Sequence, residues 1–178
     1  ADVTTSLRYS KIMILCDQDT DGSHIKGLCI NLFHSEWSSL IRIPGFLSFM
    51  NTPILRARKG SQTKVFYNEG EYDIWKEQIG AAVSSWTIKY FKGLGTSTSA
   101  EFKEYFANKK VVDFVYTGAK SDDIIDKIFN KKRANDRKGW LEAYDKNSYL
   151  DTSRPSVKYE EFIDNEMIHF STYDCARS

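Results

Sequence analysis

Cysteine is scarce in this sequence, and long apolar runs are missing. The 3 cysteines among 178 residues have no Cys-x-x-Cys spacing and are odd in number, so neither a disulfide framework nor a zinc module is indicated. A reducing compartment inside the cell is therefore expected. No apolar run approaches the roughly 20 residues that a membrane-spanning helix needs, and the N-terminal residues lack the pattern of a signal peptide. The sequence thus predicts no membrane association.

Excess charge of either sign is also missing. The formal net charge is +1 at pH 7, with 25 lysines and arginines against 24 aspartates and glutamates. Any contact with nucleic acid must therefore come from local patches and not from the field of the whole chain. Hydrophobic residues make up 41% of the chain and aromatic residues 14%, which is enough for one or two small domains with a proper core.

The most informative segment is a short apolar run followed by three aspartates at alternate positions. Asp17, Asp19 and Asp21 come after Ile-Met-Ile-Leu-Cys, and Gly22 follows them directly. If the chain stays extended through Asp21, the three carboxylates point to the same side. Three like charges so close repel one another unless a cation or a proton lies between them. Because carboxylate oxygens are hard ligands, the pattern predicts a site for Mg²⁺, Mn²⁺ or Ca²⁺.

Two other interpretations fit the same aspartates less well. A solvated acidic turn would be the simpler explanation for two aspartates, but not for three in register behind an apolar strand. Asp-x-Asp-x-Asp-Gly also begins an EF-hand calcium loop, whose position 12 is a glutamate; counted from Asp17, that position is Leu28. The apolar run before the aspartates is also too short and too β-rich to be the first EF-hand helix, so a calcium sensor is disfavoured.

The surrounding pattern predicts a strand, a turn and a helix. Apolar residues recur at helical spacing over residues 23–42, with Ser23 available as N-cap. Such a unit belongs to an α/β sheet, in which ligands bind at the carboxyl ends of strands. The other expected elements are a hairpin over 52–58 and 63–67, helices over 69–79, 121–131, 135–144 and 159–170, a helix that starts with a Thr98–Glu101 capping box, strands over 86–91 and 111–117, and a loop over 145–157.

A second turn, suited to anions, follows the expected strand at 86–91. Lys92, Gly93 and Gly95 lie between this strand and the next helix. Glycines let the backbone approach a partner closely, the N-terminus of a helix attracts anions, and a lysine adds a point charge for phosphate. Such turns often serve only to reverse the chain, and this one lacks the full dinucleotide and P-loop patterns. Together with the aspartates, it indicates phosphoryl-transfer chemistry on a polyanion.

The densest basic cluster comprises residues 131–133, Arg137 and Lys138 on expected helices. A solvated helix face accounts for this cluster about as well as a patch that contacts nucleic-acid phosphates, and both interpretations stay open. His24, one turn into the first helix, is placed to donate to a phosphate, although a capping or packing role is equally open.

Four segments of the chain, in collinear order, resemble the Toprim region of eukaryotic-type type IIA DNA topoisomerases. Short motifs recur by chance, but four in the same order rarely do, and together they extend over nearly the whole chain. The segments are residues 12–27, residues 90–99, residues 135–138 with Trp140, and residues 162–171 with the last three residues.

The resemblance implies an α/β fold of the Toprim type, with a Rossmann-like, mainly parallel sheet flanked by helices and a small helical extension after it. Because short, charged helices follow residue 120, a domain boundary is expected there. The expected divisions are residues 1–120 for the C-terminal, metal-binding part of the Toprim domain, 121–158 for the helical extension and loop, and 159–178 for the start of a winged-helix segment.

The resemblance also implies roles for the residues of both turns. The aspartates are implied to bind Mg²⁺ for DNA cleavage and religation, with Mn²⁺ or Ca²⁺ able to substitute, and Asp21 is the more distant of the three. The implied catalytic residues are Asp17, Asp19 and Lys92; the implied DNA-binding residues are His24, Lys92, Gly93, Gly95, Arg137 and Lys138.

In this family a tyrosine attacks the scissile phosphate, and the phosphotyrosyl link conserves the bond energy for resealing. The tyrosine and an adjacent arginine are expected beyond Ser178, and a glutamate metal ligand on an earlier strand, so none can be assigned here. The chain is therefore expected to be a fragment of a larger enzyme, and to be inactive and to bind no ATP when alone. The whole enzyme is expected to be an ATP-dependent homodimer in the nucleus that acts on double-stranded DNA. An organelle or a viral factory stays open as the location. The alternative is a stand-alone, Mg²⁺-dependent, primase-like Toprim module.

Overall fold

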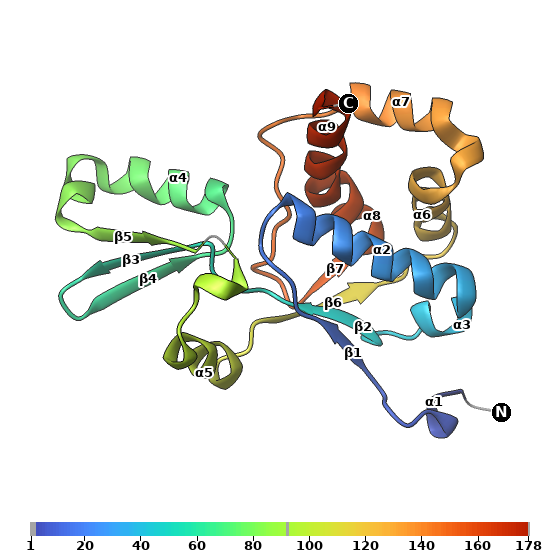
Figure 1. The fold of residues 1–178 in the computed structure, drawn as a ribbon, viewed down its shortest axis with the longest axis horizontal. Coiled ribbons are helices and arrows are strands. Elements are labelled where there is room, and N and C mark those ends of the chain that lie inside the picture. Colours follow the sequence, from blue (N-terminus) through green and yellow to red (C-terminus); the bar gives the residue numbers. More distant parts are fainter. Residues whose placement is uncertain (1–2, 92, 178) are drawn as a thin grey trace.

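The computed structural model of the chain describes residues 3–91 and 93–177 (Figure 1). In these residues the strands form two sheets, which we call the main sheet, with strand order β1–β2–β6–β7, and the small sheet, with strand order β4–β3–β5. Two of the three pairings in the main sheet are parallel, and β2 with β6 is antiparallel. The predicted α/β fold, with a mainly parallel sheet flanked by helices, is therefore confirmed.

The main sheet contains two strands that the sequence pattern did not indicate. All four residues of β2 are buried, and a strand buried on both faces shows no period-two alternation. The other unexpected strand, β7, has only three residues and falls at the end of the expected loop over 145–157. The strands of the main sheet are β1 (Ile12–Ile14), β2 (Leu47–Met50), β6 (Val111–Val115) and β7 (Ser156–Lys158).

Helices cover the main sheet and pack on one another, and Figure 1 shows α2 running in front of the sheet with α6, α8 and α9 beside it. No helix in the described ranges is both long and apolar enough to cross a membrane. The helices around this sheet are α2 (Thr20–Glu36), α3 (Ser38–Ile41), α6 (Ala119–Phe129), α7 (Ala134–Glu142), α8 (Tyr159–Phe162) and α9 (Ile168–Arg177), with a π-helical segment (Ile163–Met167) between the last two and a 3-10 turn at Lys131–Arg133. A short helix, α1 (Val3–Ser6), precedes β1, and a 3-10 turn (Leu94–Thr96) precedes α5 (Ser99–Ala107), which is joined to the small sheet by ion pairs of Glu101 with Arg56 and Lys89.

One hydrophobic core joins the main sheet to these helices. It contains Ile30 of α2 and Phe49 of β2, and also Ile125 of α6 and Phe162 of α8. Residues on both sides of position 120 thus contribute to a single core, so the domain boundary expected there does not separate two cores. The loop before β7 also belongs to this body, since Leu150 is buried in the same cluster.

The small sheet confirms the predicted hairpin and helix but places the strand at 86–91 differently. That strand pairs antiparallel with β3 in the small sheet and not in the main sheet. A second, smaller core lies between this sheet and α4, around Leu55, Phe66 and Trp75. The elements are β3 (Leu55–Lys59), β4 (Gln62–Phe66), α4 (Glu69–Ile79), a 3-10 turn (Gly80–Ser85) and β5 (Thr87–Tyr90). From β5 the chain returns to the main sheet through α5, whose Thr98–Glu101 capping box is present as predicted.

Candidate functional site

The three aspartates lie where β1 leads into α2, and they do not share one extended strand. Helix α2 begins at Thr20, and Asp19 is its N-cap, because its Oδ1 accepts a hydrogen bond from the amide of Gly22 at 2.7 Å. Asp21 lies exposed in the first turn of the helix. The expectation of an extended chain through Asp21, with Ser23 as N-cap, was therefore wrong: the carboxylate of Asp19 begins the helix earlier.

Asp17 contacts the glycine turn that follows β5. Its Oδ1 accepts a hydrogen bond from the backbone amide of Leu94 at 2.6 Å. Gly93 has φ +137°, and a Cβ at this position would lie 2.7 Å from Oδ2 of Asp17. Glycine thus suits the backbone angle, and any other residue here would displace the carboxylate of Asp17. The two turns singled out in the sequence meet at this point, although they belong to strands of different sheets.

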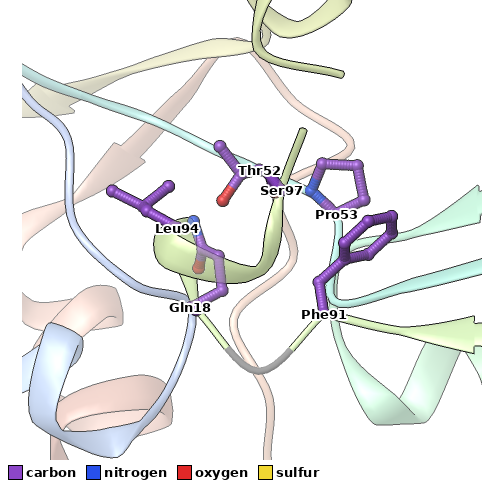
Figure 2. A pocket seen from close by; sticks show the side chains of 7 residues that line it. Gln18, Thr52, Pro53, Phe91, Leu94 and Ser97 are labelled. Atoms are coloured by element: carbon purple, nitrogen blue, oxygen red, sulfur yellow. The ribbon is translucent and has the colours of Figure 1, made fainter. Parts of the chain in front are cut away.

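Gln18 lies between the two aspartates and was not among the predicted site residues. Its side chain enters a small hollow beside Leu94 and Phe91, which Figure 2 shows from close by. The hollow has a volume of about 10 Å³, room for about one water molecule. The amide nitrogen Nε2 of Gln18 is buried there and has no hydrogen-bond partner among the described residues. Nothing in the sequence pattern distinguishes this glutamine.

Two of the predicted metal ligands keep an oxygen for a cation. Asp17 and Asp19 each use Oδ1 in the hydrogen bonds above, which leaves Oδ2 of each carboxylate. Within residues 3–91 and 93–177, no three Asp, Glu, His or Cys side chains come together as a possible metal site. Two hard oxygen donors without a third suit Mg²⁺, which commonly takes one or two carboxylates and completes its shell with water and substrate phosphate. The residues present therefore fit that ion as part of a site.

Of the other two predicted residues of the glycine turn, the structure describes Gly95. Lys92 lies outside the described residues. Gly95 is exposed, and a Cβ built on it would meet no atom within 4 Å. Steric need for glycine in this turn therefore concerns Gly93 and not Gly95.

Three predicted DNA-binding residues line one cavity of about 340 Å³ between α2, α7 and α9. They are His24, Arg137 and Lys138. The ring of His24 stacks on Phe170 of α9, with ring centroids 4.1 Å apart and planes 8° apart. The sequence suggested these residues separately, and the fold brings them together.

The basic residues near this cavity differ in the hydrogen bonds and ion pairs that they make within the chain. Nη1 of Arg137 donates to the carbonyl oxygens of Asn130 at 2.6 Å and Lys127 at 3.1 Å, so the guanidinium caps the end of α6. Arg133 donates to the carboxylates of Asp136, Asp123 and Asp126, which raise the pKa of its guanidinium above the usual range. Lys138 is exposed. Its charge is therefore more accessible to a polyanion than those of the half-buried Arg133 and Arg137.

A family model described as the C-terminal associated domain of TOPRIM matches residues 50–175. The DNA topoisomerase 2 of Plasmodium falciparum is 47% identical over 180 residues, which cover 99% of this chain and 13% of the relative. The DNA topoisomerase 2 of Arabidopsis thaliana is 47% identical over 179 residues, which cover 97% of this chain and 12% of the relative. This chain thus spans about an eighth of the length of these relatives.

A solved structure gives the same likeness in three dimensions. The crystal structure of the Plasmodium falciparum topoisomerase II DNA-binding, cleavage and re-ligation domain is similar with a TM-score of 0.92 and 47% sequence identity. The match covers 100% of this chain and 24% of that chain. The likeness therefore includes the main sheet, the small sheet and all the described helices.

Proposed function

The chain belongs to the DNA topoisomerase 2 family, and we propose that it is the part of a type IIA enzyme that holds Mg²⁺ at the DNA cleavage site. The full-length protein is then an ATP-dependent homodimer that breaks both strands of one DNA duplex through phosphotyrosine links and passes a second duplex through the break. The chain alone is inactive in this proposal, since the tyrosine and the ATPase lie elsewhere. We place its action in the nucleus, with an organelle or a viral factory as the alternatives.

The observation that carries the proposal is the contact between Asp17 and the turn at Gly93 and Leu94. This contact brings a carboxylate suited to Mg²⁺ beside a glycine turn suited to phosphate. When bound, Mg²⁺ polarises the scissile phosphate and stabilises the negative charge that develops on it. The Oδ2 atoms of Asp17 and Asp19 would hold the ion, and Asp21 would add negative charge nearby.

The other residues would bind and orient the DNA. Lys92, which directly precedes Gly93 in the sequence, would bind a phosphate of the DNA at the cleavage site. Gly93 and Gly95 would let the DNA backbone approach the turn. Around the cavity between α2, α7 and α9, Lys138 would contact phosphates further along the duplex, supported by the remaining N–H groups of Arg137 and by His24.

The test is DNA cleavage by the full-length protein with Asp17→Ala. Loss of one metal ligand is expected to lower Mg²⁺-dependent cleavage by about 100-fold or more, because a catalytic metal contributes several kcal/mol. DNA binding, measured at one fixed salt concentration, is expected to change little. Wild-type cleavage by this variant would refute the metal assignment. The alternative, a primase-like module, predicts no cleavage by the wild-type protein under the same conditions.

A further inference from the structure

Lys26 is a charged side chain within the core under α2. It is 1% exposed, and its Nζ lies 2.7 Å from Oε1 of Glu166. The ammonium group also lies over the rings of Phe49 and Phe162, with 4.5 Å and 5.6 Å to the ring centroids. Lysine is almost never fully buried unless it is paired. A buried ion pair often stabilises a fold no more than apolar residues of similar size would in its place. The pair therefore calls for a role other than stability.

Glu166 belongs to the π-helical segment between α8 and α9. Short π-helical segments are rare and occur frequently at functional sites. Helix α2 approaches this segment closely at Gly27, where a Cβ would lie 2.4 Å from Sδ of Met167. The segment and α2 are thus in direct contact along one face, and Glu166 reaches α2 from that contact.

The same carboxylate oxygen that pairs with Lys26 also reaches the first turn of α2. Oγ of Ser23 lies 2.9 Å from Oε1 of Glu166 and 3.2 Å from the carbonyl oxygen of Asp19. Because a hydroxyl carries one proton, Ser23 donates to one of these two oxygens at a time. Ser23 is itself buried. The backbone amide of Ser23 also donates to the carbonyl oxygen of Asp19, at 3.1 Å, so Glu166 is connected to the backbone of Asp19 through this one residue.

The residue before Asp17 contacts the first turn of α2. Cys16 is buried, and its thiol donates to the carbonyl oxygen of Gly22 at 3.3 Å. The segment before Asp17 is thus bonded to the same first turn of α2 that Ser23 links to Glu166.

We propose that Glu166, together with Lys26, is a positioning residue for the metal site: the pair fixes the first turn of α2 so that Asp17 and Asp19 face the same ion. A hydrogen-bonded ion pair fixes direction and register, whereas apolar packing alone tolerates small rotations of a helix. This inference rests on the proposed function, because it assigns the partners that orient the carboxylates of that same site.

The test uses the full-length protein and two readouts: its affinity for Mg²⁺ without DNA, measured by calorimetry, and the Mg²⁺ concentration that gives half-maximal DNA cleavage. In Glu166→Gln we expect the affinity to fall and this concentration to rise, each about 10-fold or more, the usual effect of removing a group that orients metal ligands. Ser23→Ala removes only one hydroxyl, so it keeps the test decisive should Glu166→Gln fail to fold. In Ser23→Ala we expect the Mg²⁺ concentration for half-maximal cleavage to rise as well, but by less than in Glu166→Gln.

Glu160→Gln is the matched control, because it makes the same chemical change on α8. Glu160 accepts from Thr117 at 2.7 Å and from Ser121 at 3.1 Å, and it has no part in the proposed site. This control is expected to keep the wild-type Mg²⁺ midpoint. Unchanged midpoints in folded Glu166→Gln, or in Ser23→Ala if the former does not fold, would overturn the inference. Cleavage that survives in Asp17→Ala would instead refute the proposed function, so the two failures are distinguishable.

Discussion

The carboxylate of Asp17 accepts a hydrogen bond from the backbone amide of Leu94, across 2.6 Å in space and 77 positions in the sequence. Asp17 follows β1 of the main sheet, whereas Leu94 follows β5 of the small sheet. The bond therefore fixes the glycine turn of one sheet against the aspartates of the other. Any change that moves one partner is expected to disturb the other.

Gly93→Ala is expected to separate Asp17 from the turn. A Cβ at position 93 would lie 2.7 Å from Oδ2 of Asp17, so the carboxylate must move, and φ +137° adds backbone strain. In the full-length protein, Mg²⁺-dependent DNA cleavage should fall by about 10-fold or more. Gly118→Ala separates the two causes, since Gly118 also has positive φ, +87°, but open space around it. An equal loss of cleavage in both variants would show that backbone strain accounts for the effect, and wild-type cleavage by Gly93→Ala would contradict the expected displacement of Asp17.

Asp19 is expected to serve both as N-cap of α2 and as metal ligand, and two substitutions separate these roles. Asp19→Ala removes both and should lower the free energy of unfolding by about 1 kcal/mol. Asp19→Asn keeps an oxygen that can accept from Gly22, so stability should change little, but the charge for Mg²⁺ is lost. Thermal unfolding measures the capping role in both variants, and DNA cleavage measures the metal-binding role. Normal cleavage by the folded Asn variant would leave Asp19 with the capping role only.

Lys138 and Arg137 are expected to differ in their effect on DNA binding. Lys138→Ala should weaken binding, and the slope of log affinity against log salt should become shallower by about 1, with no change in stability. Arg137→Ala should weaken binding and also lower the melting temperature, because the guanidinium caps α6. Lys59→Ala, in the exposed hairpin of the small sheet, is the control for general charge loss. If Lys138→Ala and Lys59→Ala have the same slope, the basic cluster is only a solvated helix face.

Glu101 is expected to make stability depend on pH in the acid range. Hydrogen bonds from Lys89 and from the amide and hydroxyl of Thr98 lower the pKa of its carboxyl from 4.5 to about 2, against the opposing effect of burial. The carboxylate therefore stabilises the fold fully above pH 4.5, and this stabilisation is lost as the pH falls toward 2. The Glu101→Gln variant should have a lower free energy of unfolding than the wild-type protein at pH 7, and this free energy should fall less between pH 4.5 and pH 2. Denaturant unfolding at several pH values measures this difference. An equal fall in the free energy of unfolding of both proteins would contradict the prediction.

The sequence predicted the parts of the site whose signals are local. The apolar run, the alternating aspartates and the glycine turn are short patterns, and α4 was placed at its observed bounds. Strand β2 was missed because burial on both faces removes its alternation. The start of α2 was misplaced because Asp19 was taken only as a ligand, although aspartate is also a favoured N-cap.

The remaining parts of the site depend on contacts that no local pattern encodes. Lys26 and Glu166 are separated by 140 positions, and a lysine in a helix is normally expected on its solvated face. Only the packing of the π-helical segment on α2 brings the two charges together. The bond from Leu94 to Asp17 likewise requires the small sheet to be placed against the main sheet.

The position of a bound metal ion tests the central claim most directly. The full-length protein would be crystallised with DNA and Mn²⁺, and the anomalous signal of the ion located. We predict an ion within coordination distance, about 2.1 Å, of carboxylate oxygens of both Asp17 and Asp19, beside the turn that contains Gly93. An ion that binds the DNA phosphate without touching either aspartate would contradict the account.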